Sequence, residues 1–128
     1  NVPSIESVGG FSGFRIFDGT SANQISFIIY PTGRLQSTAF DGGVLVSNID
    51  DSGYGLTSGV HKIAVAYKLN DYVLYVDGSI VGSDTSATVP SVNQFIVSYT
   101  NGGSQIYNES KIYNTRLTNA ELATLTTL

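Results

Sequence analysis

The sequence lacks cysteine, methionine and tryptophan altogether, and it contains a single histidine, His61. The absence of cysteine excludes disulfide bonds, thiolate metal sites and cysteine nucleophiles. With one imidazole, neither a cluster of histidine metal ligands nor a Ser-His-Asp triad has support in the sequence. We therefore expect His61 to begin a strand and to form local hydrogen bonds.

Charge is also scarce. The chain has 6 Lys and Arg against 10 Asp and Glu, a net charge of −4, and only 12% charged residues. The basic residues are scattered singly, so no basic stripe is present that would neutralise nucleic-acid phosphates. No apolar run approaches the roughly 20 residues of a membrane-spanning helix. The composition therefore argues against nucleic-acid binding and against membrane insertion.

Length and termini suggest how the chain is organised. A length of 128 residues suits one domain with its own core. The first residues, Asn1 to Pro3, resemble no signal peptide, and the sequence does not begin with Met. We expect residues 1–128 to form a single domain, taken from a longer protein.

What the sequence does contain favours β structure. Apolar residues make up 41% of the chain, and its 14 Gly, with many Ser, Thr and Asn, are typical of frequent tight turns. Short runs rich in β-branched and aromatic residues, bounded by such turns, predict strands. Outside the central part of the chain, these predicted strands cover residues 13–17, 24–30, 34–40, 44–47, 94–99 and 105–113.

The clearest pattern lies between residues 59 and 81, which we interpret as a three-stranded meander. From residue 62 to residue 69, larger apolar side chains alternate with Lys and Ala, as the period of a strand requires, and the alanines are small enough to lie under other elements. Asp77-Gly78 suits a two-residue type I′ hairpin turn, in which both central residues have φ > 0. Eight or nine short strands with turns between them predict an all-β sandwich.

Only the end of the chain has a helical pattern. Thr118 and Glu121 have the spacing of a capping box, in which the two side chains satisfy the first free amides of a helix. Leu122 and Leu125 would give that helix a small apolar face. We therefore expect a short C-terminal helix that covers a sheet edge.

Two segments together resemble a known family. The hairpin G-V-H-K-I-A-V-A-Y (59–67) and Y-V-L-Y-V-D-G (72–78) resembles the central hairpin of concanavalin A-like, laminin G-like jelly-roll domains. K-I-Y-N-T-R-L-T-N-A-E-L (111–122) resembles their last strand, which runs into a short closing helix. The Ser- and Thr-rich surroundings look most like the copies found in bacteriophage tail fibre and virion surface proteins.

The resemblance implies a two-sheet antiparallel jelly-roll sandwich with a short C-terminal helix. Its members include lectins, carbohydrate-binding modules, adhesion domains and glucanases, so the fold alone does not choose a function. The residues before Gly13 match poorly, which leaves an early strand missing, shortened or supplied by a neighbouring chain.

The sequence gives little support for catalysis. The glucanases of this superfamily carry carboxylates that alternate along one strand, and no such pattern is present. Asp50 and Asp51 form the only adjacent acidic pair, and neighbours on a strand face opposite ways. We therefore expect no catalytic residues and no enzymatic activity.

A calcium site is the one metal alternative. Asn48, Asp50 and Asp51 with nearby carbonyl groups would supply the oxygen ligands that hard cations prefer. An ordinary Asx turn explains the same residues, and we favour that interpretation. We expect no cofactor and no metal site.

Tyrosine is abundant, with 8 copies. It stacks on sugar rings, but it is also a common strand residue, and Tyr67, Tyr72 and Tyr75 are expected to pack inside strands. Tyr54 and Tyr99 stand next to glycine-rich turns and are better candidates for contact with a ligand. The predicted ligand-binding residues are Asp50, Asp51, Tyr54, Tyr99 and Asn101.

Our leading hypothesis is a non-catalytic, lectin-like domain of a phage tail fibre or virion surface protein, located extracellularly, that binds a host-surface glycan or envelope receptor. The alternative is a structural domain that decorates a virion or oligomerises, for example as a trimer, by packing against copies or other virion proteins. A glucanase is the last choice, because paired acids are lacking.

Overall fold

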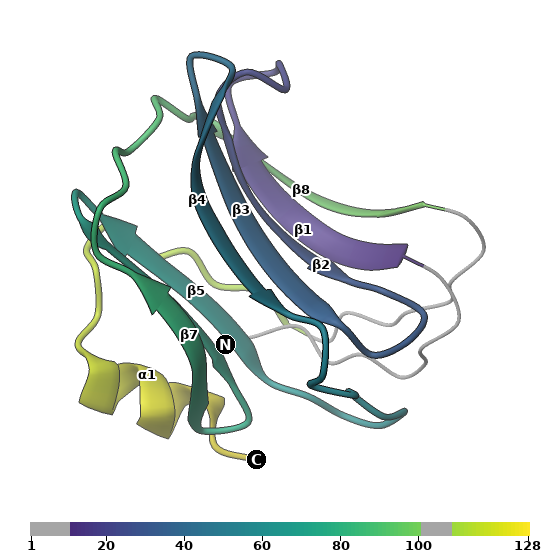
Figure 1. The fold of residues 1–128 in the computed structure, drawn as a ribbon. Helices are drawn as coiled ribbons and strands as arrows, with labels where there is room; N and C mark the ends of the chain where they lie inside the picture. The colour runs from purple at the N-terminus through teal and green to yellow at the C-terminus, as the bar shows by residue number, and fades with distance from the viewer. Residues whose placement is uncertain (1–10, 101–108) are drawn as a thin grey trace.

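A computed structural model describes residues 11–100 and 109–128 of the chain, and it consists of two antiparallel sheets and one helix (Figure 1). The larger sheet has five strands in the order β4-β3-β2-β1-β8, and the smaller sheet has three in the order β5-β6-β7. The elements are β1 (Phe11–Phe17), β2 (Gln24–Ile29), β3 (Leu35–Asp41), β4 (Val44–Asp51), β5 (Ile63–Lys68), β6 (Asp71–Val76), β7 (Ser79–Asp84), β8 (Gln94–Thr100) and α1 (Asn119–Thr126).

The first four strands form an up-and-down series, and β8 returns to pair with β1 at the far edge of the larger sheet. The chain crosses between the two sheets twice, after β4 and after β7. The strands of the larger sheet are curved, and their concave side faces away from the smaller sheet (Figure 1). This concave side is called the outer face below.

The smaller sheet is the predicted meander. Asp77 (φ 50°) and Gly78 (φ 83°) both lie in the left-handed region between the paired residues Val76 and Ser79, as a type I′ turn requires. The turn before β6 uses Asn70, with φ of 57°, because Asn tolerates this conformation better than most residues. The meander and its tightest turn are therefore confirmed.

The core lies between the sheets. Alternate residues of β2, Ile25, Phe27 and Ile29, are buried on one side, and alternate residues of β6 meet them from the other. At one edge, β4 lies so close to β7 that a Cβ on Gly82 would be 2.6 Å from Ile49 Cγ2. The sandwich is therefore tightly closed along that edge.

The helix α1 adds a third layer on the far side of the smaller sheet (Figure 1), so it covers a face of that sheet and not the sheet edge expected from the sequence. Leu122 is buried there against Ala66, Val73 and Tyr75. The predicted capping box is present, with Thr118 Oγ1 accepting from the Glu121 amide at 3.2 Å and the Glu121 carboxylate accepting from the Thr118 amide at 2.7 Å. The alanines of β5 thus lie under the helix, as their size suggested.

The predicted all-β, two-sheet antiparallel jelly-roll sandwich with a short C-terminal helix is confirmed. The strand predicted over 105–113 is wrong for residues 109–113, which lie in no strand; residues 105–108 fall outside the described part of the chain. Strand β4 is longer than predicted, because its second half, with Ile49 among Asn48, Asp50 and Asp51, is mainly polar and the apolar pattern did not include it. Within the described residues, no helix has the length and hydropathy needed to cross a membrane.

Candidate binding face of the larger sheet

The outer face of the larger sheet carries polar side chains in neighbouring positions on successive strands. In β2, β3 and β4, one set of alternate residues points into the core and the other set points outward. The strand register brings the outward residues level with one another. The central part of this face consists of Arg15, Ser26, Ile28, Gln36, Thr38, Asn48 and Asp50.

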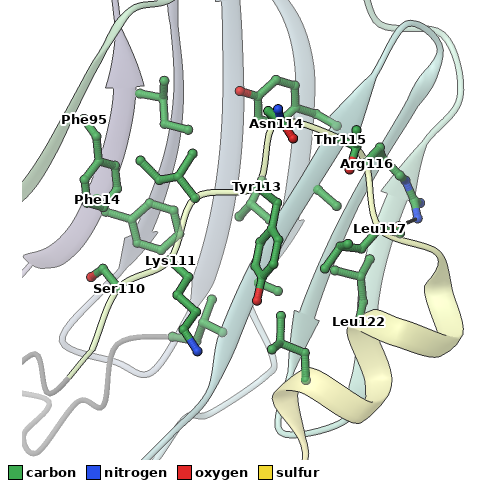
Figure 2. A pocket seen from close by; sticks show the side chains of 18 residues that line it. Phe14, Phe95, Ser110, Lys111, Tyr113, Asn114, Thr115, Arg116, Leu117 and Leu122 are labelled. Carbon is green, nitrogen blue, oxygen red and sulfur yellow. Dashed lines mark hydrogen bonds between the residues drawn. The ribbon is translucent and has the colours of Figure 1, made fainter.

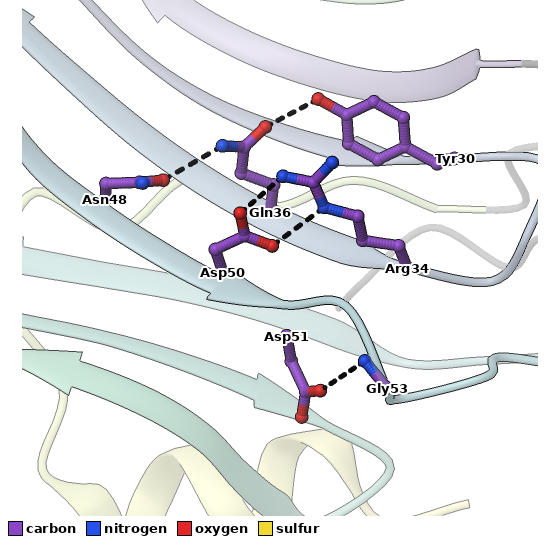
Figure 3. A network of polar contacts seen from close by, with 7 residues as sticks. All are labelled: Tyr30, Arg34, Gln36, Asn48, Asp50, Asp51 and Gly53. Carbon is purple, nitrogen blue, oxygen red and sulfur yellow. Dashed lines mark hydrogen bonds and ion pairs between the residues drawn. The ribbon is translucent and has the colours of Figure 1, made fainter.

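A chain of hydrogen bonds runs across the strands on this face (Figure 3). The Tyr30 hydroxyl donates to Gln36 Oε1 at 2.6 Å, and Gln36 Nε2 donates to Asn48 Oδ1 at 2.9 Å. Ser26 and Thr38 share a further hydroxyl bond of 2.8 Å. The side chains are therefore held in fixed positions by one another.

Arg34 and Asp50 form the charged end of the network (Figure 3). Arg34 Nε donates to Asp50 Oδ1 at 2.8 Å, and a second guanidinium nitrogen pairs with Oδ2. The guanidinium also lies over the Tyr30 ring, 4.6 Å from its centroid. These bonds lower the pKa of Asp50 and raise that of Arg34, so both groups remain charged at neutral pH.

Asp50 and Asp51 do not act together. Asp50 lies on the outer face, whereas Asp51 Oδ1 accepts a hydrogen bond from the Gly53 amide at 3.0 Å (Figure 3). The Asp51 contact is that of an Asx turn, the interpretation favoured for this loop. Asn48 and Asp50 are already bonded to Gln36 and Arg34, so the proposed calcium ligands do not converge. Among the described residues, no three His, Asp or Glu side chains gather as a metal site.

Of the two tyrosines predicted to contact a ligand, Tyr54 lies away from the outer face, and the side chain of Tyr99 lies outside the described residues. Tyr54 packs partly buried against the core, and burial, followed by the charges of Asp77 and Asp51, raises its pKa. The structure therefore does not bring Tyr54 to the face that carries Asp50. Asn101 and the side chain of Tyr99 lie outside the described residues.

The other sequence predictions concern packing. Tyr72 and Tyr75 are buried, and the Tyr72 hydroxyl donates to the Thr88 carbonyl at 2.7 Å, which confirms their packing role. His61 precedes β5, and its ring nitrogens lie 2.7 Å from Asp77 Oδ2 and 2.9 Å from the Thr57 carbonyl. The expected local hydrogen bonding of His61 is confirmed.

A second concave feature lies at the open edge of the sandwich, between β5 and the edge of the larger sheet formed by β1 and β8. Here residues 110–117 cross the gap and, with Phe14 and Phe95, enclose a cavity of about 220 Å³ (Figure 2). Ile112 and Tyr113 on this segment are 62% and 46% exposed. The lining of the cavity is more apolar than polar, in contrast to the outer face.

Among the described residues, the outer face groups hydroxyl, amide and guanidinium side chains, which are the groups that hydrogen-bond polar ligands. Sequence reasoning found Asp50 and mentioned Asn48, but it missed Arg15, Tyr30, Arg34 and Gln36. The signal that points to them is the polar half of the alternating pattern in β2 to β4, because those residues share one face once the register is known.

Comparison with known proteins adds little. No protein-family model matches this chain, and no curated protein matches it. A 2.1 Å crystal structure of an S-layer domain-containing protein from Clostridium thermocellum (residues 221–444) is similar, with 22% identity and a TM-score of 0.44. The similarity covers 94% of this chain and 64% of that one. Nothing about the ligands of this chain follows from it.

Proposed function

We propose that this chain is a non-catalytic, lectin-like domain that binds a glycan on the outer face of its larger sheet. The proposal is based on the row of hydroxyl and amide side chains on this face, which hydrogen bonds hold in fixed positions across β2, β3 and β4. Sugars are recognised by such convergent polar groups beside aromatic or apolar surface. Tyr30 and the exposed Ile96 supply that surface here.

The setting we propose is extracellular, on a phage tail fibre or another virion surface protein, with a host-surface glycan or envelope receptor as the partner. The concanavalin A-like resemblance of residues 59–78 motivates this setting, and the sandwich fold agrees with it.

A glycan array with the folded domain tests the proposal. We expect binding to at least one polysaccharide, and Asn48→Ala together with Gln36→Ala should weaken it about ten-fold or more, because two fixed hydrogen-bonding groups are lost. Asn114→Ala provides a matched control, since Asn114 is exposed beside the cavity on the other side of the larger sheet. If no polysaccharide or host cell binds, or if Asn114→Ala alone abolishes binding, the proposal is wrong.

A second function has one specific observation in its favour. Phe95, Ile112 and Tyr113 are exposed apolar residues around the cavity at the open edge, a surface suited to protein contact. The domain would then decorate a virion or oligomerise, for instance as a trimer, with this edge against another virion protein. Light scattering separates the two functions, because a strictly monomeric domain that binds glycans supports the lectin-like one.

A further inference from the structure

Arg15 occupies a central position on the outer face. It lies on β1, and the register places it level with Ile96 on β8 and with Ser26 on β2. The same row continues through Thr38 to Asn48. With neighbouring strands about 5 Å apart, the row from Arg15 to Asn48 spans about 14 Å, which suits an oligosaccharide better than a single sugar.

The surroundings of Arg15 differ from those of the other described arginines. Arg34 pairs with Asp50 and Arg116 with Asp71, whereas Arg15 has no carboxylate partner within residues 11–100 and 109–128. Its guanidinium lies over the Phe17 ring, 4.1 Å from the centroid, and Nη1 makes one long bond of 3.4 Å to Gln24 Oε1. Its Nε is buried without a hydrogen-bond partner in the same part of the chain.

The nearest acidic residue along β1 does not neutralise this charge. Asp18 uses one carboxylate oxygen for the amide and hydroxyl of Thr20 and the other for Asn23 Nδ2 at 2.8 Å. Arg34 and Asp50 cancel one another, so among the described residues Arg15 adds a positive charge to the outer face of a chain with net charge −4. A positive charge there favours association with an anion, whereas the net charge of the chain disfavours non-specific association with one.

We propose that the ligand of the outer face is an acidic polysaccharide, in which a sugar carboxylate binds the Arg15 guanidinium while hydroxyl groups bind Thr38 and Asn48. This inference rests on the proposed glycan-binding function and names its ligand class. A planar guanidinium backed by an aromatic ring presents paired N–H donors, and a carboxylate matches their geometry.

The test uses polygalacturonate, alginate and hyaluronate, each beside its methyl-esterified form, which keeps the sugar backbone and removes the charge. We expect the native domain to bind at least one acidic polymer about ten-fold or more tightly than its ester. Arg15→Gln should abolish that preference, Arg15→Lys should retain part of it, and added NaCl should weaken it. Lys68→Gln is the matched control, because it removes the same charge from the end of β5 in the smaller sheet.

The outcomes separate the two proposals. If the domain binds neutral glycans or the esters as tightly as the acids, and Arg15→Gln has no effect, the acidic ligand is wrong and the lectin-like function stands. If dextran sulfate binds equally well and Lys68→Gln weakens binding as much as Arg15→Gln, the attraction is a general charge effect, and the inference also fails. If no polysaccharide of any charge binds, both proposals fail.

Discussion

The two sheets of this domain differ in how far their outward faces are buried. The smaller sheet buries both faces of its central strand: every residue from Tyr72 to Val76 is buried, one set against the larger sheet and the other against α1. The larger sheet buries one face only, and within the described residues its other face carries hydroxyl, amide and charged side chains. The comparison indicates that the second face of the smaller sheet adds to the packed core under α1, while the outer face of the larger sheet adds polar groups, the ones that the proposed function uses.

The polar network on the larger sheet supports this division. Hydrogen bonds and ion pairs between exposed side chains contribute little to folding, because water competes for the same groups. Yet the outer-face side chains are bonded to one another in fixed positions. Fixed polar groups reduce the entropy lost when a ligand binds, so their arrangement is better explained by recognition than by stability.

The largest expected effect comes from breaking the larger sheet at Gly13. A Cβ at this position would lie 1.8 Å from the Phe27 carbonyl oxygen on β2, which is a backbone atom and cannot move aside locally. We expect Gly13→Ala to destabilise the domain by about 3 kcal/mol or more, measured by urea unfolding. Gly53→Ala is the control, because its Cβ would meet only Asp51 Oδ1 at 3.7 Å. Equal stability of the two variants would contradict the close β1–β2 approach.

A pair of leucine variants compares the two outer faces directly. Leu122, on the side of α1 that packs against the smaller sheet, is 2% exposed. Leu45, on the edge strand β4 of the larger sheet, is 49% exposed. We expect Leu122→Ala to cost about 3 kcal/mol and Leu45→Ala less than about 0.5 kcal/mol by thermal or denaturant unfolding. Comparable losses at the two positions would mean that both faces are stabilising layers.

The next prediction concerns the stability that the N-terminal cap of α1 contributes. Thr118→Ala removes the hydroxyl that accepts from the Glu121 amide, and we expect a loss of about 1 kcal/mol. Thr115→Ala, at an exposed position just before the helix, serves as the control. Glycan binding should be unchanged in both variants, since neither residue lies on the outer face. A loss of binding in Thr118→Ala would place the ligand on the helical side.

The smallest effect concerns acid stability. Hydrogen bonds hold the pKa values of Asp18, Asp50 and Glu121 below their ordinary values of 3.8, 3.8 and 4.5. A carboxyl whose pKa is lowered by folding contributes stability above its unfolded pKa and loses it as the pH falls through the folded one. Stability should therefore be flat near neutral pH and decline below about pH 4. Asp50→Asn should flatten that decline slightly, and a steeper decline would contradict the assignment.

Much of the fold was predictable because local chemistry and alternation agree. The Asp77-Gly78 turn, the alternating residues of β5 and the Thr118 capping box each specify their own structure within a few residues. The strand predicted at 105–113 is wrong over its last five residues. The alternation in K-I-Y produces a strand only where the backbone can form hydrogen bonds with a neighbouring strand. The binding face was harder to predict, since Arg15, Gln36 and Asn48 are far apart in sequence and only the register brings them together.

The central claim, that the outer face of the larger sheet binds the ligand, is tested most directly by mapping backbone amide chemical shifts during titration with the tightest-binding polysaccharide fragment. The account predicts shifts that cluster at Arg15, Ser26, Thr38 and Asn48, with the β5–β7 sheet and α1 little changed. Shifts confined to residues 110–117 and Leu122, around the cavity at the open edge, would contradict it.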